Sequence, residues 1–225
     1  MTTSAGTRFV LYSYWRSSSS WRVRIGLHLK GIAFEYAALD LRSGAQFSPA
    51  HRARSAMSQV PVLEVVEGGR TRDLVQSMAI LEWLDERFPQ PPLLPSDPDG
   101  RARVRAVAEH VNSGIQPYQN HTVLEWLRER QAGLEQTWVR HWVAFGLSGL
   151  ERAVQGGAGR FCHGDQVTLA DLYVVPQLYG ARRFGVDLAA CPTLLRIEAS
   201  CRELEAFRRA EPEAQPDAAP PDRRS

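Results

Sequence analysis

Lysine and cysteine are scarce in this sequence of 225 residues. Lys30 is the single lysine, and because folding does not require arginine at all the other basic positions, we attribute the imbalance to codon usage. The three cysteines, Cys162, Cys191 and Cys201, form no C-x-x-C pair, so we expect them to be structural. The low number of cysteines and the lack of an apolar signal core near the N-terminus predict a reduced protein of the cytoplasm.

Charge of one sign and long apolar runs are also missing. The formal net charge of +2 gives no electrostatic footprint for nucleic acid or for an acidic membrane surface. No apolar run reaches the length that crosses a bilayer, so no membrane partner is expected. No metal site is expected either, because no histidine stands at a ligand spacing from another His, Cys or carboxylate; the histidines are His28, His51, His110, His121, His141 and His163.

Apolar residues make up 44% of the chain, which is enough for a full core. Short apolar and aromatic runs in the first part predict strands, and longer periodic runs predict helices. The helix expected at 21–30 is apolar on more than one side and should be buried on more than one side. The predicted elements follow the order βαβ then ββα. The strands are expected at 8–13, 33–39, 60–66 and 73–75, and the helices at 21–30 and 76–88, with a short helix within 44–58. This order is typical of a thioredoxin-like domain, expected over 1–89.

Composition changes after this part. The stretch PQPPLLPSDPDG is too rich in proline for an ordinary helix and predicts a linker over 90–100. Beyond it the pattern is helical, and we expect an all-helical domain over 101–210. The Pro- and charge-rich tail, 211–225, is expected to be disordered. The helices expected in the second part cover 101–130, kinked at Gly114 and Pro117, then 134–154, 169–184 and a short pair that ends near Arg209.

Two smaller patterns in the helical part predict local structure. Thr168 is expected to cap the third of these helices, with Asp171 completing a variant of the capping box. Trp138, Trp142 and Phe145 recur at helical spacing. We expect these aromatic side chains in the core rather than around a cofactor.

Four consecutive serines, Ser17–Ser20, lie between the first predicted strand and helix. The first N–H groups of a helix lack partners within the helix, and that end carries partial positive charge. Serine hydroxyls cap such an end, and a spare hydroxyl can point at a bound anion such as a thiolate, whose pKa falls there. No cysteine lies in this stretch, so a thiol would have to arrive with a ligand. A simple cap and turn would explain the serines equally well, and the spacing leaves both interpretations open.

The same stretch resembles the active-site motif of the zeta class of glutathione transferases, the family that includes maleylacetoacetate isomerase. That motif is written S-S-C-[SA]-W-R-V-R-I-A-L, and residues 17–27 here read SSSSWRVRIGL. Further segments resemble family motifs in the same order: AMSQVPVL, VQSMAILEWLDE, SGIQPYQN, GDQVTLADLYVVPQ and RFGVDL. The resemblance covers about residues 8–218. It implies the glutathione transferase fold, in which a thioredoxin-like domain is followed by an all-helical domain.

The resemblance also implies a glutathione site. Ser17 and Ser18 match the serines that face the glutathione sulfur, and Val60, before an expected cis-proline, matches the residue whose backbone pairs with the cysteinyl backbone. Gln76 and Ser77 match the residues that take the γ-glutamyl carboxylate. The implied glutathione contacts are Ser17, Ser18, Ser19, Ser20, Trp21, Arg22, Gln46, Val60, Gln76, Ser77, Gln116, Asn120, His121 and Thr122, and the implied catalytic residues are Ser17, Ser18, Ser19 and Arg183.

Two positions depart from the family pattern. Ser19 stands where the family has cysteine, which weakens a reductive dehalogenase interpretation and puts the isomerase rate or substrate in question. His121 stands where leucine is common at the mouth of the site, although a histidine on a helix surface is the simpler account. The arginines of RARVR, 101–105, fit a solvated helix face and a dimer contact equally well.

The activity that the resemblance implies is the glutathione-dependent cis–trans isomerisation of a small anionic enedione. An example is maleylacetoacetate, which becomes fumarylacetoacetate in tyrosine and phenylalanine catabolism; maleylpyruvate would use the same steps. The thiolate would add to C2, the former double bond would rotate, and elimination would regenerate glutathione, which is therefore a cofactor. Arg183, with Arg22 as a second candidate, would hold the substrate carboxylate. The family also implies a homodimer.

Two other functions stay open at this point. A conjugating or tailoring enzyme acting on another electrophilic metabolite would fit the changed residues Ser19 and His121. A binding module of the same fold without catalysis is the third possibility. The retention of the implied glutathione residues argues against it; these are Ser17, Ser18, Pro61, Gln76 and Ser77.

Overall fold

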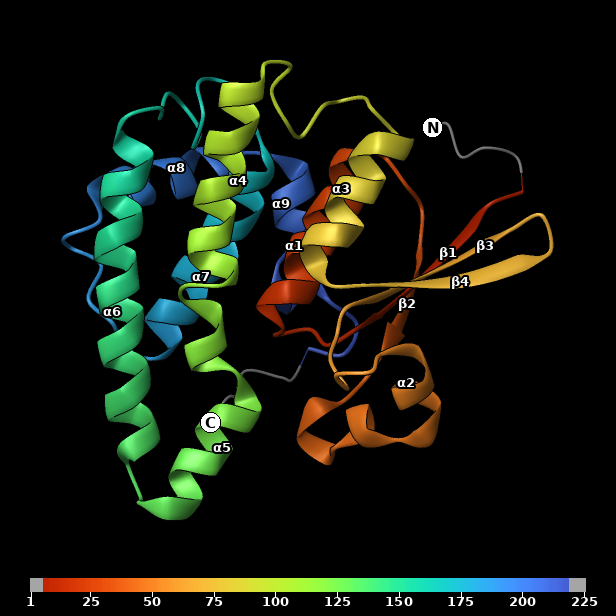
Figure 1. Ribbon diagram of the computed structural model, residues 1–225, viewed down its shortest axis with the longest axis horizontal. Helices are drawn as coiled ribbons and strands as arrows, with labels where there is room; N and C mark the ends of the chain where they lie inside the picture. Colours follow the sequence, from red (N-terminus) through yellow and green to blue (C-terminus); the bar gives the residue numbers. More distant parts are fainter. Residues whose placement is uncertain (1–5, 219–225) are drawn as a thin grey trace. The chain divides into compact units, whose positions relative to one another are not determined.

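The computed structural model describes residues 6–218, which form two compact units (Figure 1). The first unit contains the chain up to Pro91 and again from Leu204 onward. The second unit is Pro92–Glu203. The first is α/β and the second is helical, which confirms the predicted fold class.

A mixed four-stranded sheet organises the first unit, in the order β2-β1-β3-β4. Strand β1 pairs parallel with β2 and antiparallel with β3, and β3 pairs antiparallel with β4. Val62 of β3 lies opposite both Tyr12 of β1 and Val75 of β4. The ends of β1 and β4 and the start of β3 therefore meet at one edge of the sheet. The strands are β1 (Arg8–Ser13), β2 (Glu35–Ala38), β3 (Val62–Glu67) and β4 (Arg70–Val75).

Helices cover both faces of this sheet. Figure 1 shows α1 (Ser18–Leu29) and α3 (Ser77–Arg87) on one side and α2 (Pro49–Arg54) on the other. Helix α9 (Glu205–Ala210) packs against α1. Because α1 contacts α3 and α9 and lies over one face of the sheet (Figure 1), every residue from 20 to 27 is buried, as the two-sided apolar pattern predicts.

Helix α7 is the centre of the second unit. It is buried over most of its length and contacts α4, α6 and α8. Thr168 and Asp171 form the predicted capping box at its start. The helices of this unit are α4 (Pro98–Asn112), α5 (His121–Arg130), α6 (Leu134–Gln155), α7 (Leu169–Arg183) and α8 (Pro192–Arg202), with the short 3-10 helix η3 (Gln116–Gln119). The first unit contains the 3-10 helices η1 (Leu41–Ser43), η2 (Ala45–Phe47) and η4 (Pro212–Ala214). Within residues 6–218, no helix has the length and apolarity that a bilayer crossing requires.

The helix expected over 101–130 is two helices, α4 and α5, with η3 between them. Two helices also start earlier than predicted. Helix α1 begins at Ser18, three residues before the expected start, because Ser17 caps it. Helix α4 begins at Pro98, inside the predicted linker. The side chain of Asp97 accepts from the N–H of Gly100 at 2.7 Å, and Pro98 at the first helical position needs no hydrogen-bond partner for its nitrogen.

The chain after α9 does not match the predicted disorder from residue 211. Pro212–Ala214 forms η4. The buried side chain of Gln215 donates to the backbone carbonyls of Arg209 in α9 and of Glu211, at 2.9 and 2.8 Å. Composition predicts disorder here, but a few specific hydrogen bonds outweigh it. The remainder of that predicted tail, 219–225, lies outside the described residues.

Phe145 is not in the core, contrary to the prediction. Its side chain on α6 is 69% exposed. Trp138 and Trp142 are half-buried and pack with Tyr118, whose ring is stacked on that of Trp142 at 4.9 Å between centroids. Helical spacing predicted the shared stripe correctly, but the core-facing side of α6 is lined instead by valines and leucines, among them Val143.

The single lysine closes α1. Lys30 is its C-cap residue, and the side chain has 0% exposure. The ammonium lies 2.6 Å from the carboxylate of Asp85 in α3 and 2.5 Å from the carbonyl oxygen of Pro91. The carboxylate and the carbonyl oxygen compensate the cost of burying the ammonium. The ion pair between Lys30 and Asp85 joins the end of α1 to α3.

Candidate active site

One edge of the sheet collects the predicted site residues of the first unit. The chain leaves β1 towards Ser17, enters β3 just after Val60, and leaves β4 into the first residues of α3. Because Val62 is paired with both neighbouring strands, these three segments are neighbours. Leu39, after β2, is joined to the same edge by its N–H, which donates to the carbonyl of Ser13 at 2.8 Å.

The first turn of α1 carries hydroxyl groups and no acid. Ser17 is the N-cap residue, and its Oγ accepts from the N–H of Ser20 at 3.2 Å. Ser18 and Ser19 are half-buried in the first turn, which contains no acidic residue. The predicted cap is therefore confirmed. The positive end of the helix dipole has no internal counter-charge, so an external anion is favoured there.

The first turn of α3 has a second anion-binding geometry. Gln76 caps this helix with φ of 69° and ψ of 120°, a conformation that residues other than glycine rarely adopt. Strain of this kind costs about 1–3 kcal/mol and is concentrated at functional sites. The buried Ser77 begins the helix, and its Oγ accepts from the guanidinium of Arg22 at 3.3 Å. An arginine thus supports the hydroxyl at this helix start.

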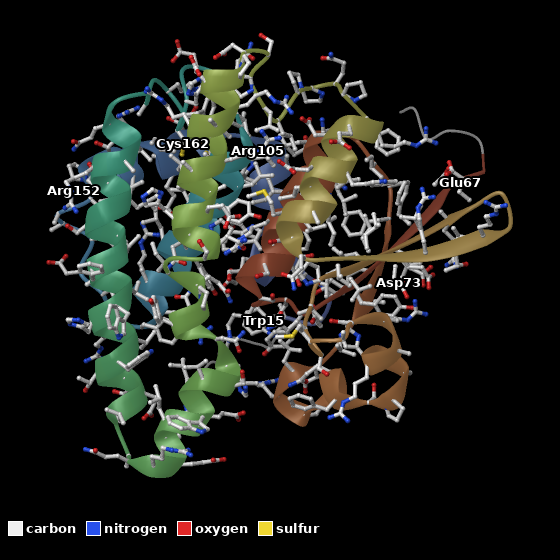
Figure 2. All side chains as sticks on the ribbon, in the orientation of Figure 1. Trp15, Glu67, Asp73, Arg105, Arg152 and Cys162 are labelled. Carbon is white, nitrogen blue, oxygen red and sulfur yellow. The ribbon has the colours of Figure 1, made fainter. Side chains whose placement is uncertain are left out.

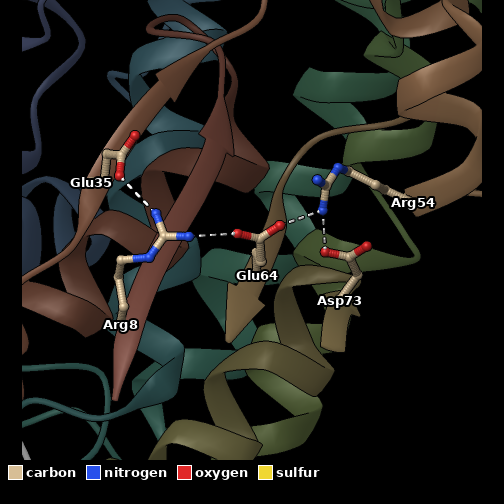
Figure 3. A network of polar contacts seen from close by, with 5 residues as sticks. All are labelled: Arg8, Glu35, Arg54, Glu64 and Asp73. Atoms are coloured by element: carbon tan, nitrogen blue, oxygen red, sulfur yellow. Dashed lines mark hydrogen bonds and ion pairs between the residues drawn. The ribbon is translucent and has the colours of Figure 1, made fainter. Parts of the chain in front are cut away.

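A chain of ion pairs anchors α2 to the sheet (Figure 3). Arg54 ends α2 and lies 2.6 Å from Glu64 of β3 and 2.8 Å from Asp73 of β4. Glu64 also reaches Arg8 at 3.6 Å, and Arg8 pairs with Glu35 at 3.0 Å. Glu64 is buried, so its charge depends on these partners. The network fixes the end of α2, which leads into the chain before β3.

Hydrogen bonds among its own residues stabilise the turn between α2 and β3. The buried ring of His51 places Nε2 3.0 Å from the carbonyl oxygen of Gln59, and the N–H of Gln59 donates to Ser55 Oγ at 3.1 Å. Val60 follows directly, and its peptide bond to Pro61 is cis, as predicted. The turn therefore presents the Val60 backbone at the edge of the sheet in a fixed conformation.

Gln46 lies on η2 and is buried. Its Oε1 has no hydrogen-bond partner among the described residues. Buried polar atoms without partners are rare, and a donor on a bound ligand would satisfy this one.

The predicted residues of the second unit lie on η3, α5 and α7. Gln116 begins η3. Gln119 of η3 and Gln177 of α7 exchange hydrogen bonds between their side-chain amides, at 2.9 and 3.3 Å. Arg183 is the last residue of the same α7, is exposed, and has its guanidinium over the ring of Phe184 at 4.6 Å. The amide pair thus couples the Gln116 segment to the helix that carries Arg183.

Three predicted contacts have local roles at the start of α5. Asn120 caps the helix, and its Oδ1 accepts from the N–H and the hydroxyl of Thr122 at 3.1 and 2.9 Å. His121 Nδ1 lies 3.1 Å from the carboxylate of Glu125, and both side chains are about half exposed. These roles account for the residue types, and contact with a ligand remains a prediction.

Three other predicted contacts are fully buried. Ser20, Trp21 and Arg22 have at most 1% exposure. Their burial counts against direct contact with a ligand, and Arg22 in particular does not present its guanidinium to a substrate carboxylate. Contact of these three residues with a ligand stays a prediction.

The cysteines lie away from solvent. All three are free and buried, and Figure 2 labels Cys162 in the second unit. Burial raises the pKa of the Cys162 thiol well above its usual value, with the charge of Asp171 adding to the effect. It raises the pKa values of Cys191 and Cys201 in the same way. Such thiols are not nucleophiles. Among the described residues, no group of three His, Cys, Asp or Glu side chains is placed to hold a metal ion.

Sequence reasoning missed the residues that support the site. His51 and Arg54 make no motif, and neither was predicted. One signal was available, because Glu64 interrupts an otherwise apolar strand and a buried acid needs a partner. It does not say which arginine supplies that partner.

The fold agrees with comparisons to known proteins. The model of the glutathione S-transferase N-terminal domain matches residues 16–87. The chain is 45% identical over 214 residues to a maleylpyruvate isomerase from a Ralstonia species, with 93% of this chain and 99% of the relative covered. It is 42% identical to a zeta-class glutathione S-transferase of Euphorbia esula, with 94% and 93% covered. The chain belongs to the zeta class of glutathione transferases.

A solved structure of this class is similar over almost the whole length. A maleylacetoacetate isomerase from Anaeromyxobacter dehalogenans, crystallised with glutathione bound in its active site, is 62% identical to this zeta-class chain. The TM-score is 0.90, and the match covers 95% of this chain and 99% of the other.

Proposed function

We propose that this zeta-class transferase is a glutathione-dependent cis–trans isomerase of maleylacetoacetate-type enediones. The observation that carries the proposal is the sheet edge of the first unit, where an acid-free, serine-capped helix start adjoins Val60 and its cis-proline. The high identity to a maleylacetoacetate isomerase that binds glutathione supports it. The proposal includes a role in tyrosine and phenylalanine catabolism.

The residues present fit glutathione as a cofactor. A backbone at Val60 suits the peptide part of the ligand, and the start of α3 at Ser77, supported by Arg22, suits its γ-glutamyl carboxylate. The unpartnered Oε1 of Gln46 provides an acceptor for a donor of the ligand. When bound, glutathione supplies the thiolate that adds reversibly to the enedione.

Each residue then has a definable task. The N-terminus of α1, with Ser17 and its neighbouring hydroxyls, stabilises negative charge on sulfur and so favours the thiolate at neutral pH. Arg183 offers a guanidinium to the carboxylate of the substrate. Arg22 supports Ser77 from behind and does not bind substrate directly.

The test is isomerisation of maleylacetone, an analogue of maleylacetoacetate, with and without glutathione. Ser17→Ala should lower turnover by about a hundredfold or more, as the loss of one donor to a reacting anion does elsewhere. The matched control is Asp97→Ala, which removes the N-cap of α4. Each variant should lose about 1 kcal/mol of stability, and only Ser17→Ala should lose activity. Wild-type protein that binds glutathione without turnover would disprove the isomerase and favour conjugation of another electrophile.

Maleylpyruvate is the second candidate substrate. The relative named maleylpyruvate isomerase, at 45% identity over nearly its full length, favours its inclusion. The same assay with maleylpyruvate gives the ratio of kcat/KM for the two enediones. The proposal also includes a homodimer and a cytoplasmic location; the three free cysteines are compatible with a reducing compartment.

A further inference from the structure

The described end of the chain reaches back to the loop between β1 and α1. Asp217 Oδ2 accepts a hydrogen bond from the backbone N–H of Trp15 at 3.0 Å. Its Oδ1 accepts from the hydroxyl of Tyr36, on β2, at 2.7 Å. Figure 2 labels Trp15, which lies just beyond β1 and two residues before Ser17. One carboxylate therefore joins the last described residues to the loop after β1 and to β2.

A buried arginine fixes the same loop from the other side. Arg24 on α1 donates to the carbonyl oxygens of Trp15 at 3.0 Å and Tyr14 at 3.5 Å, and to Ala210 of α9 at 3.0 Å. Burial lowers the pKa of Arg24 to about 10, and the charge of Asp217 opposes that shift. The peptide groups of Trp15 are thus fixed at the N–H by a carboxylate and at the carbonyl by a guanidinium.

This loop contacts both Ser17 and Val60, two residues of the proposed glutathione site. The N–H of Ser17 donates to the carbonyl of Tyr14 at 3.0 Å, which is the same carbonyl that Arg24 reaches. Tyr14 and Trp15 also form a buried cluster with Val60, and Ala218 packs against this cluster. The segment from Glu211 to Ala218 therefore touches the loop that ends in the thiolate-facing serine and the residue expected to pair with the peptide of glutathione.

We propose that Asp217 is a positioning residue of the active site, which orients the Tyr14–Ser17 loop and Val60 for glutathione through its bonds to Trp15 and Tyr36. This inference rests on the proposed function. It gives the end of the chain a task in binding and thiol activation, in addition to covering α1.

The test compares Asp217→Ala with wild type in three readouts. These are the dissociation constant for glutathione, the pKa of the bound thiol from the pH dependence of thiolate absorbance, and kcat and KM for maleylacetone. We expect weaker glutathione binding and a bound-thiol pKa raised by about one unit, which is roughly a tenfold smaller thiolate fraction below that pKa. We expect kcat to fall while KM for maleylacetone changes little, because Asp217 is not placed to touch the enedione.

The control is Glu213→Ala, which removes an exposed carboxylate from the same segment and should leave all three readouts at wild-type values. If Asp217→Ala lowers only the melting temperature, with binding, thiol pKa, kcat and KM unchanged in the folded protein, Asp217 is a structural anchor and the inference is wrong. If that variant does not fold, Asp217→Asn decides by the same readouts, since it keeps the shape and removes the charge.

The failure of the proposed function would look different. Wild type that binds glutathione without isomerising maleylacetone disproves the isomerase, while glutathione affinity and thiol pKa still decide the role of Asp217. Wild type that binds no glutathione overturns both.

Discussion

Helices α1 and α7 both begin with a hydroxyl residue at the N-cap, but their first turns are completed in opposite ways. In α7 the carboxylate of Asp171 accepts from the N–H of Thr168 at 2.8 Å, from the Thr168 hydroxyl at 3.0 Å and from the N–H of Cys162 at 2.8 Å. In α1 the cap is Ser17, and the first turn has hydroxyls and no acid. The positive end of the helix dipole is therefore neutralised by a carboxylate of the chain in α7, whereas in α1 no acid of the first turn neutralises it.

The comparison shows what separates a structural helix start from a binding site. Asp171 is fully buried, and burial raises its pKa, while the N–H groups of Cys162 and Thr168 oppose that change. A buried acid of this kind satisfies the chain's own donors and leaves nothing for a ligand. The first turn of α1 keeps its electrostatic preference for an anion because no side chain there supplies one.

The largest effect is expected when the internal acid of α7 is removed. Asp171→Ala leaves the N–H groups of Cys162 and Thr168 buried without a partner, and should lower the free energy of unfolding by about 3–5 kcal/mol. Urea denaturation measures this. Asp187→Ala is the control, because that exposed carboxylate accepts only a local N–H, from Ala189, and its loss should cost about 1 kcal/mol or less. Equal losses in the two variants would contradict this account of α7.

The converse change gives α1 an internal acid. Ser19→Asp should favour the helix slightly, yet disfavour a thiolate beside it and lower glutathione-dependent turnover by about tenfold to a hundredfold. Ser19→Asn has nearly the same size without the charge and is the matched control. Steady-state rates at several pH values should show a raised thiol pKa in the Asp variant alone. If both variants lose activity equally, size at this position matters and charge does not.

The smallest effect concerns the other ends of the two helices. Helix α7 ends in Arg182 and Arg183, whereas α1 has His28 in its last turn. Burial, with Arg209 and Arg24 nearby, lowers the pKa of His28 to about 4, and Glu205 opposes the shift. The unfolded chain therefore binds this proton more tightly, so stability should fall as the pH drops from about 6.5 towards 4.

His28→Gln should flatten this part of the stability profile, measured by urea denaturation at several pH values. His110→Gln, at an exposed histidine on α4, is the control and should keep the wild-type slope. A wild-type slope in His28→Gln would assign the acid sensitivity to other groups.

Local patterns predicted much of the fold. Apolar periodicity, capping residues and proline act within a few residues, and they predicted the strands, most of the long helices and the capping box of Thr168 and Asp171. At Gly114 and Pro117 they predicted a kink, whereas α4 ends there and α5 begins only after η3. The ends of the helices were predicted less accurately. They depend on capping residues such as Asp97, whose side-chain rotamer cannot be read from the apolar pattern of the sequence.

The serine cap of α1 was predictable from the sequence, but the contacts that support it were not. Arg22 and Arg24 occupy similar places in a basic-looking motif, yet one holds Ser77 and the other holds the loop before Ser17. Asp217 lies about 200 residues from its partner Trp15, and composition indicated disorder there. Such contacts depend on tertiary structure, and a single sequence carries no signal for them.

The buried ammonium of Lys30 has a practical consequence. Because Lys30 is the single lysine and its side chain is buried, reagents that acylate ε-amino groups find no accessible side-chain target on the folded protein. A lysine-specific protease likewise has one cleavage position in the whole chain, and it is closed while Asp85 and Pro91 hold the side chain. The fraction of protein modified at Lys30 therefore measures the fraction of molecules in which the end of α1 has separated from α3. Lys30 is thus a built-in chemical probe of this local unfolding.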